Sequence, residues 1–247
     1  MNISEIKKNA LSFDKEIEKL KKRNQTSKFS WYPYGSMNNF IHIENLLSEE
    51  NRNILNPKTI KSIVDIGSAD GDNSFFLEKL GFNVDIIEYA PTNFNSLQGA
   101  KLLKKVLKSN IQIHEIDLDS QFNLPSKKYD LVFFLGILYH LKNPYYALET
   151  LAKSCQYCLL STRVIKYAPD LKTNISNYSF AYLVDSTETN NDATNYWMFT
   201  TPGLKRICHR TGWEIADYIT VGNTKNSDPV TKNGDERAFC LLKSNFF

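Results

Sequence analysis

A glycine turn between an apolar strand and a helix start is the feature that most constrains the fold of this sequence. It runs from Val64 to Asp72, and the next apolar segment ends in the carboxylate of Glu88. Gly67 can take backbone angles closed to other residues, and Gly71 lets the chain approach a ligand without an intervening Cβ. Strand, glycine turn, helix and a following acidic residue are typical of a nucleoside-cofactor site, in which Glu88 accepts hydrogen bonds from a ribose diol.

The turn differs from a dinucleotide fingerprint because it reads Gly-x-x-x-Gly and places Asp70 and Asp72 where a pyrophosphate needs bare amides. Carboxylates repel phosphate but suit a cofactor with a ribose and a cationic amino acid tail. The turn therefore resembles the first motif of class I S-adenosylmethionine-dependent methyltransferases. An ordinary strand-to-helix turn of another α/β protein is the alternative.

Alternating apolar strands and helices extend through most of the chain. We predict an α/β fold, namely a Rossmann-like, doubly wound, mostly parallel seven-stranded sheet with an antiparallel terminal strand and an N-terminal helical segment. The predicted strands cover residues 62–66, 83–88, 111–116, 129–135, 157–161, 214–221 and 237–242. The predicted helices cover residues 1–24, 72–80, 93–108 and 144–153, and a further helix runs from Thr201 to a stop at Gly212.

The domain organisation follows from the same pattern. Residues 1–57 form a helical and aromatic N-terminal segment, and residues 58–247 form the methyltransferase-like domain. Within that domain, residues 163–200 interrupt the alternation and are rich in Asn, Asp and aromatic residues. Such long segments are usually functional or disordered, and the amide and aromatic side chains here favour an insert that covers the substrate. An insert that only shields the sheet is the alternative.

Composition narrows the class of protein. With 247 residues and 42% hydrophobic content the chain can form one large domain, and it has no apolar run long enough for a membrane span. We expect a cytoplasmic protein with no membrane partner and no metal. Cys155 and Cys158 form a C-x-x-C, which could indicate zinc or redox chemistry, but they stand at the start of an apolar strand. Cys208 and Cys240 have no partner at zinc-site spacing, so we expect all four to be buried thiols.

The net charge of +3 is too small to indicate a nucleic-acid partner by itself. Its distribution is uneven, because residues 1–28 carry eight Lys or Arg against four acids. A basic leading helix is compatible with contact to a phosphate backbone, although a solvated helix face is the commoner cause. The substrate is therefore either a small molecule or an RNA.

Residues that follow each strand should gather at one edge of the sheet, where doubly wound proteins bind ligands. Asp117 can accept a hydrogen bond from the adenine amine and Leu118 can cover the adenine face, although the Asp117 region could instead only cap a turn. The predicted cofactor-binding residues are Asp65, Gly67, Ser68, Asp70, Gly71, Glu88, Tyr89, Asp117, Leu118, Leu135, Gly136 and Tyr139.

A second motif, Leu135-Gly-Ile-Leu-Tyr-His-Leu-Lys-Asn-Pro144, places Tyr139 and His140 directly after a buried strand. With the downstream YWMFTTPGLKRICHRTGW and ERAFCLLKS, it resembles the tRNA wobble-uridine carboxymethyltransferase family over about residues 28–244, apart from most of residues 163–200. The resemblance implies carboxylated S-adenosylmethionine as an alternative donor. It assigns Tyr139 and Arg237 to the donor's carboxylate, together with a lysine for which Lys28 is the candidate.

The chemistry needs an acceptor held in line behind the methyl carbon, and a base when that acceptor is a hydroxyl or amine. His140 has a suitable reference pKa for a base, or it only ties the loop by hydrogen bonds. We predict catalytic roles for His140 and Tyr139. The predicted substrate-binding residues are Trp31, Tyr34, Arg163, Asn195, Trp197 and Arg237.

Three functions remain open at this point. The first is methyl transfer from S-adenosylmethionine to a small molecule or sugar. The second is methyl or carboxymethyl transfer to a tRNA wobble uridine. The third is a cofactor-fold protein without catalysis that binds a partner through its aromatic segment, residues 29–37.

Overall fold

The computed structural model describes residues 2–126 and 128–247. These residues divide into two compact units. The first unit contains the chain up to Asp117 together with Tyr129–Phe133, and the second contains Leu118–Lys128 together with Phe134–Phe247. Helices and strands alternate along the chain, which confirms the predicted α/β class.

Parallel strands form the sheet of the first unit. Their order is β3 (Gln112–Glu115), β2 (Asn83–Glu88), β1 (Ser62–Ile66) and β4 (Tyr129–Leu135), of which the first five residues belong to this unit. The bounds of β1, β2 and β4 are those predicted from the sequence. β1 pairs in parallel with both β2 and β4, as a doubly wound sheet requires.

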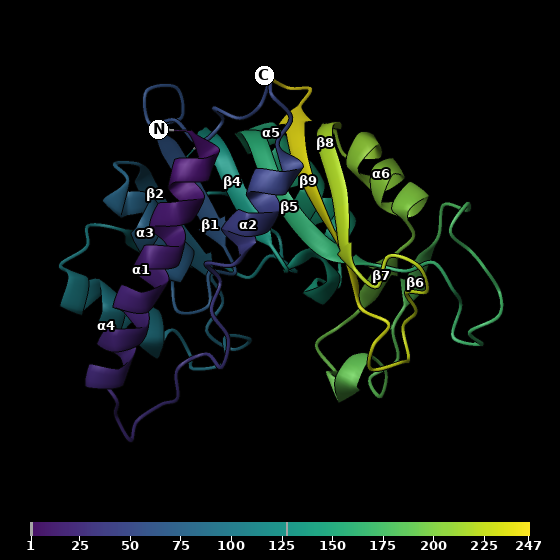
Figure 1. Cartoon of the computed structure of the whole chain (residues 1–247), viewed down its shortest axis with the longest axis horizontal. Coiled ribbons are helices and arrows are strands. Elements are labelled where there is room, and N and C mark those ends of the chain that lie inside the picture. The colour runs from purple at the N-terminus through teal and green to yellow at the C-terminus, as the bar shows by residue number, and fades with distance from the viewer. Residues whose placement is uncertain (1, 127) are drawn as a thin grey trace. The chain divides into compact units, whose positions relative to one another are not determined.

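Four helices belong to the first unit: α1 (Ile3–Arg23), α2 (Asn39–Leu46), α3 (Asp72–Lys79) and α4 (Gln98–Leu107). The side chain of Asn2 caps α1 by accepting a hydrogen bond from the Glu5 amide at 2.9 Å. α1 lies over α3 (Figure 1), and the rings of Phe13 and Phe76 are 5.6 Å apart. The predicted N-terminal helix is therefore part of the first unit's core.

The start of α4 corrects the sequence prediction, which placed it at residue 93. The helix begins five residues later because asparagine side chains hold the preceding segment in a turn. Oδ1 of Asn93 accepts hydrogen bonds from the amides of Asn95 and Leu97. Ser96 and Leu97 have positive φ angles of 53° and 66°, which a helix does not allow.

The sheet of the second unit contains the long strand β5 (Cys155–Val164). It pairs antiparallel with β9 (Glu236–Ser244), which pairs antiparallel with β8 (Trp213–Gly222). This confirms the antiparallel terminal strand. Two further strands lie in the insert: β7 (Trp197–Phe199) is parallel to β5, and β6 (Ala181–Leu183) is antiparallel to β7. The described residues thus form nine strands where the sequence predicted seven.

The two α-helices of the second unit begin at the predicted residues, Pro144 and Thr201. Asn143 caps α5 (Pro144–Ser154) by accepting from the Tyr146 amide at 3.2 Å, and Thr200 caps α6 (Thr201–Arg210). α6 lies beside β8 (Figure 1). Two short 3₁₀ helices, η1 (Leu138–His140) and η2 (Thr189–Asn191), complete the elements.

The insert, residues 163–200, leaves the sheet at the end of β5 and returns to it at β7, which pairs with the end of β5. Val164 of β5 is the register partner of Phe199 of β7, and the Ile165 amide donates to the Phe199 carbonyl at 2.9 Å. Between these points the insert has its own apolar cluster of Ile165, Ile175, Val184 and Met198. It is therefore an ordered excursion with a small core of its own.

The four cysteines are free and buried, as the sequence predicted. Burial raises the pKa of each thiol, which disfavours the reactive thiolate form. In the part of the chain that the structure describes, no three His, Cys, Asp or Glu side chains gather as metal ligands. Over the same residues, no helix has the length and apolar character needed to cross a bilayer.

Candidate functional site

The glycine turn of the first unit connects β1 to α3. The Gly67 amide, at φ +70°, donates to the Ile87 carbonyl at 3.0 Å and so ties the end of β1 to β2. Gly71 has φ +87° and stands at the start of α3. A Cβ on Gly71 would lie 2.8 Å from the Phe75 ring, so both conformation and space require glycine there.

Glu88 stands at the end of β2, directly beside this turn. Its Oε1 accepts a hydrogen bond from the Ala69 amide at 2.8 Å, and its carbonyl accepts one from Ile116 at 2.9 Å. The second bond brings the chain before Asp117 next to Glu88, so the ends of β1, β2 and β3 meet. Burial raises the pKa of Glu88 to about 7. The site thus holds a carboxylate whose ionised state is poorly solvated.

Asp65 lies in β1 just before the turn and is buried, as are Ser68 and Asp70 within the turn. The Ser74 hydroxyl of α3 donates to an Asp65 oxygen at 2.5 Å. Burial raises the pKa of Asp65 to about 7, against the effect of that hydrogen bond. Because its carboxylate ties β1 to α3, Asp65 fixes the shape of the turn.

A lysine from α1 neutralises the two carboxylates of the turn. Nζ of Lys21 lies 2.9 Å from Asp70 and 2.8 Å from Asp72. Burial alone would lower the pKa of Lys21, but the charges of Asp72 and Asp70 outweigh it and raise the pKa. The sequence assigned these carboxylates to a cationic cofactor tail, whereas the structure pairs them with a cation of the chain itself.

The aromatic segment, residues 29–37, packs against the same turn. The Tyr32 amide donates to Asp70 at 3.0 Å, and the Tyr32 hydroxyl accepts from the Phe94 amide at 2.9 Å. The ring of Trp31 lies 5.6 Å from Nζ of Lys21. Tyr34 is 66% exposed. The structure thus brings Trp31 to the glycine turn and leaves Tyr34 at the surface.

In the second unit, the loop after β4 places a glycine between two predicted ligand-binding side chains. Gly136 has φ +78°, and its amide donates to the Ser161 carbonyl at 2.9 Å. A Cβ at Gly136 would lie 3.2 Å from a terminal nitrogen of Arg237 and 3.8 Å from the Tyr139 hydroxyl. The guanidinium of Arg237 is 5.7 Å from the centre of the Tyr139 ring. Tyr139 and Arg237 therefore face the same small space.

His140 follows Tyr139 in η1, and the two ring centres are 4.2 Å apart. Nδ1 of His140 lies 3.0 Å from the Thr194 carbonyl oxygen. A carbonyl only accepts hydrogen bonds, so Nδ1 carries the proton and Nε2 has the free lone pair. Burial lowers the pKa of His140, assisted by the charges of Arg237 and Arg163. Both effects favour the neutral imidazole, whose free lone pair lies on Nε2.

The insert is joined to this loop at further points. The Tyr196 amide donates to the Tyr139 carbonyl at 2.8 Å, and Nε1 of Trp197 donates to the Lys142 carbonyl at 3.3 Å. Asn195 is buried, and no hydrogen-bond partner is found for its Oδ1 among the described residues. Arg163 of β5 is ion-paired with Asp235 at 2.8 Å.

The predicted site residues fall into two sets by unit. The first unit brings together its turn residues, Glu88, Tyr89 and the chain before Asp117, and the second unit brings together Gly136, Tyr139, His140 and Arg237. Leu118 is buried and Leu135 is half-buried. Lys28, the lysine candidate, is exposed.

Sequence reasoning missed Lys21, Asp192 and Thr194. Lys21 gave a weak signal, because it falls on the side of α1 that carries Phe13 and Ile17 toward the core. Asp192 and Thr194 gave none, since their contact with His140 joins residues more than fifty positions apart.

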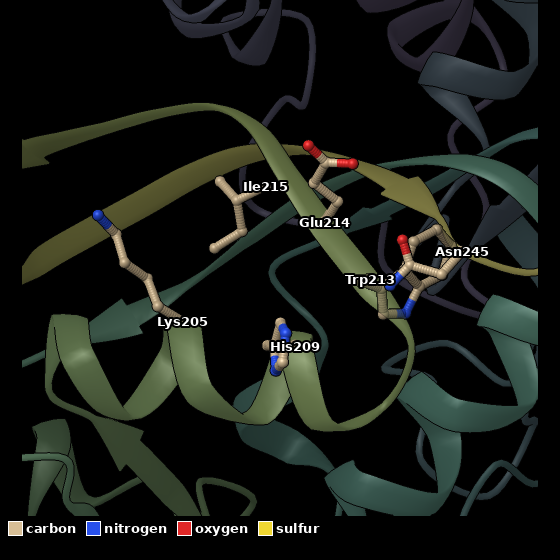
Figure 2. Close-up of a pocket in the computed structure, with 6 residues that line it drawn as sticks. All are labelled: Lys205, His209, Trp213, Glu214, Ile215 and Asn245. Atoms are coloured by element: carbon tan, nitrogen blue, oxygen red, sulfur yellow. The ribbon is translucent and has the colours of Figure 1, made fainter.

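A pocket of about 440 Å³ lies elsewhere in the second unit, between α6 and β8. Figure 2 shows Lys205 and His209 reaching from α6, with Glu214 and Ile215 on the neighbouring strand. Trp213 and Asn245 complete the lining. None of the predicted cofactor or substrate residues lines this pocket, and it lacks the glycine turn and carboxylate that a nucleoside cofactor needs.

Several solved structures are similar to this chain in fold. The EvdMO1 N-terminal domain, solved with SAH bound, superposes with a TM-score of 0.57 at 15% identity, covering 99% of this chain and 97% of that one. An S-adenosylmethionine-dependent methyltransferase from Clostridium acetobutylicum gives a TM-score of 0.53 at 12% identity, covering 84% and 98%. The PH0226 protein from Pyrococcus horikoshii gives 0.54 at 14% identity, covering 83% and 91%.

These structural likenesses establish the Rossmann-like fold. No curated protein matches the chain. A family model described as a methyltransferase domain matches residues 20–218, which is more than half of the sequence. The chain belongs to this methyltransferase family.

Proposed function

We propose that this methyltransferase transfers the methyl group of S-adenosylmethionine to a hydroxyl group of a small molecule, with a sugar as the favoured acceptor class. The observation that carries the proposal is the Nδ1–H···O=C bond from His140 to Thr194. It leaves Nε2 as a basic nitrogen on a neutral ring, which is what deprotonation of a hydroxyl requires. The EvdMO1 domain, which was also solved in the presence of SAH and D-fucose, supports a sugar.

The residues of the first unit suit S-adenosylmethionine. The positive φ of Gly71 allows the tight turn from β1 into α3, and the Glu88 carboxylate stands at the end of the second strand to accept from a ribose diol. When bound, the cofactor supplies an electrophilic methyl group on a sulfonium. Adenine contacts by Asp117 and Leu118 remain predictions from the sequence.

The second unit supplies the acceptor chemistry in this proposal. Nε2 of His140 takes the hydroxyl proton as the oxygen becomes methylated, and the imidazolium then returns that proton to solvent. Asn195 stays a predicted acceptor-binding residue, and its buried Oδ1 lacks a hydrogen-bond partner among the described residues. Trp197 offers a flat face for a sugar ring.

The test combines binding and turnover. Calorimetric titration with S-adenosylmethionine should show binding to the wild type and to His140→Gln but not to Glu88→Ala. Release of S-adenosylhomocysteine with a panel of neutral sugars should then fall by about 10²–10⁴-fold in His140→Gln. Equal turnover by wild type and His140→Gln would refute the base. Partner binding without cofactor binding would instead favour the non-catalytic reading.

The proximity of Arg237 and Tyr139 favours a second candidate, carboxymethyl transfer to a tRNA wobble uridine. Both side chains lie within 4 Å of the Cβ position of Gly136, where they could hold a carboxylate between a guanidinium and a hydroxyl. Titration with S-adenosylmethionine and with its carboxylated form separates the two donors. Arg237→Met should weaken only the carboxylated form, and equal weakening of both would count against this candidate.

The RNA part of this candidate has a separate test. Truncating residues 1–28 would remove Lys21 from a buried ion pair, so surface substitutions are the sharper probe. Lys15, Lys19 and Lys22 are exposed on α1. Their combined replacement by Ala should weaken tRNA binding and reduce its salt dependence if α1 contacts phosphates. Unchanged binding would remove α1 from the RNA surface.

A further inference from the structure

The loop that carries His140 and the insert are joined by a short row of hydrogen bonds. Thr194, Tyr196 and Trp197 of the insert contact His140, Tyr139 and Lys142, respectively. Two of these bonds use backbone amide or carbonyl groups of the insert and one uses the indole nitrogen of Trp197. These three hydrogen bonds hold residues 194–197 of the insert alongside residues 139–142 of the loop.

The contact at His140 also determines which ring nitrogen carries the proton. Nδ1 lies 3.0 Å from the Thr194 carbonyl oxygen and 3.0 Å from the Thr194 hydroxyl oxygen. The hydroxyl lies 2.6 Å from Oδ1 of Asp192, and because a carboxylate only accepts, the hydroxyl proton points to Asp192. Both Thr194 oxygens therefore present lone pairs to Nδ1. That arrangement selects the Nδ1–H tautomer.

Asp192 is held in the ionised state that this arrangement needs. Burial favours the neutral acid, but hydrogen bonds from the Thr194 hydroxyl and amide, together with the charge of Arg163, lower the pKa of Asp192. Three charged groups influence the imidazole: Asp192 from the insert, Arg163 from β5 and Arg237 from β9. Asp192 favours the imidazolium, and the two arginines oppose it.

We propose that Asp192 and Thr194 are positioning residues that set the tautomer of His140, so that the insert completes the catalytic base as well as covering the acceptor. The proposal rests on the proposed function, in which Nε2 of His140 takes the acceptor's proton. The chain from Asp192 through Thr194 to Nδ1 orients the ring and keeps the proton off Nε2. His140 then has the correct tautomer for proton transfer only when the insert is docked on the loop.

The insert contains an internal control for this arrangement. Asp185 and Thr187 form the same kind of turn, in which the Thr187 amide and hydroxyl donate to Asp185 at 2.9 and 2.7 Å. No histidine nitrogen bonds to Thr187 among the described contacts. Asp185→Asn therefore perturbs an equivalent turn without touching the base.

NMR spectroscopy of the His140 imidazole tests the proposal without an acceptor substrate. Long-range ¹H–¹⁵N spectra of the full chain report the tautomer and titration of each histidine, and His140→Gln assigns the His140 signals among the four. The wild type should show Nδ1–H. Asp192→Asn and Thr194→Val should give a mixture of tautomers, and Asp192→Asn should also lower the pKa of His140 because a favourable negative charge is lost. Asp185→Asn should change neither.

The outcomes separate this proposal from the base assignment itself. An Nε2–H tautomer in the wild type, or spectra of His140 unaffected by both variants, would overturn the positioning role. Once an acceptor is found, kcat against pH gives a second readout. Asp192→Asn should move the acidic limb to lower pH and reduce the plateau at least 10-fold, and Thr194→Ser should restore turnover that Thr194→Val loses. A normal tautomer response with full activity in His140→Gln would refute the proposed base and leave the positioning intact.

Discussion

Nζ of Lys21 lies 2.9 Å from a carboxylate oxygen of Asp70, and this ion pair joins the first helix to the glycine turn across almost fifty residues of sequence. Asp70 also accepts hydrogen bonds from Asn95 and from the Tyr32 amide. One carboxylate thus gathers the leading helix, the aromatic segment and the segment before α4. The shape of the cofactor turn therefore depends on residues well outside its motif.

Replacing Lys21 should destabilise the fold strongly. Lys21→Met leaves Asp70 and Asp72 buried without their cation, and breaking a buried pair in this way costs about 3–5 kcal/mol. Urea unfolding at neutral pH measures the loss. Lys22→Met is the matched control, because Lys22 is the exposed neighbour on the same helix and should change the unfolding free energy by less than about 0.5 kcal/mol. Equal effects of the two variants would contradict the ion pair.

Alanine substitutions at Gly71 and Gly81 should separate the effect of backbone strain on stability from the effect of close packing. Gly71→Ala should suffer both, because φ is +87° and the added Cβ would meet Phe75 at 2.8 Å. Gly81→Ala has φ +96° and open space, so it should lose only the roughly 1–2 kcal/mol of left-handed strain. Thermal unfolding should rank Gly71→Ala as the less stable variant. S-adenosylmethionine titration should show weakened binding for Gly71→Ala alone.

Glu88 should make the stability of the protein fall as the pH rises. Its pKa is raised from 4.5 to about 7, mainly by burial. Its contribution is therefore complete below about pH 4.5 and disappears as the pH rises through 7. That loss is on the order of 3 kcal/mol. Unfolding free energies at pH 5 and pH 8 should differ less in Glu88→Gln than in the wild type, with Asp65 supplying a remaining slope in the same direction.

The cap residue Thr200 should control both α6 and the insert. Its hydroxyl accepts from the Gly203 amide and donates to the Tyr178 carbonyl, and its side chain is fully buried. Thr200→Val should lower the unfolding free energy by about 1–3 kcal/mol and speed proteolysis within residues 163–200. Thr201→Val loses a single bond to Tyr218 and should leave the proteolysis rate unchanged. Equal proteolysis rates for both variants and the wild type would contradict the link.

Local signals in the sequence predicted the parts of the fold that local chemistry determines. The apolar runs of β1, β2 and β4 gave their bounds, and the predicted helix start at residue 144 is the start of α5. The start of α4 was predicted five residues early, because the apolar spacing continues through a segment that Asn93 and Asn95 hold in a turn. The three-residue strands β6 and β7 are too short to leave a periodic pattern.

Some residues of the candidate site could also be predicted from local sequence, and others could not. Gly67, Gly71 and Glu88 could be found because the motif places them at strand ends, where the fold dictates their neighbours. The partner of His140 could not be found, since Thr194 reaches it only through the path of the insert. Lys21 needed the packing of α1 on the first unit, which helical spacing alone does not reveal.

The register pair Val164–Phe199 has a consequence for how such an enzyme can diversify. Because the insert departs and returns at one rung of the sheet, a segment of different length could be recombined between these residues without displacing β9 or α6. A chimera would exchange the proposed acceptor cover together with the residues that we propose to orient His140. New acceptor preference and a working proton acceptor would then be inherited as a single module.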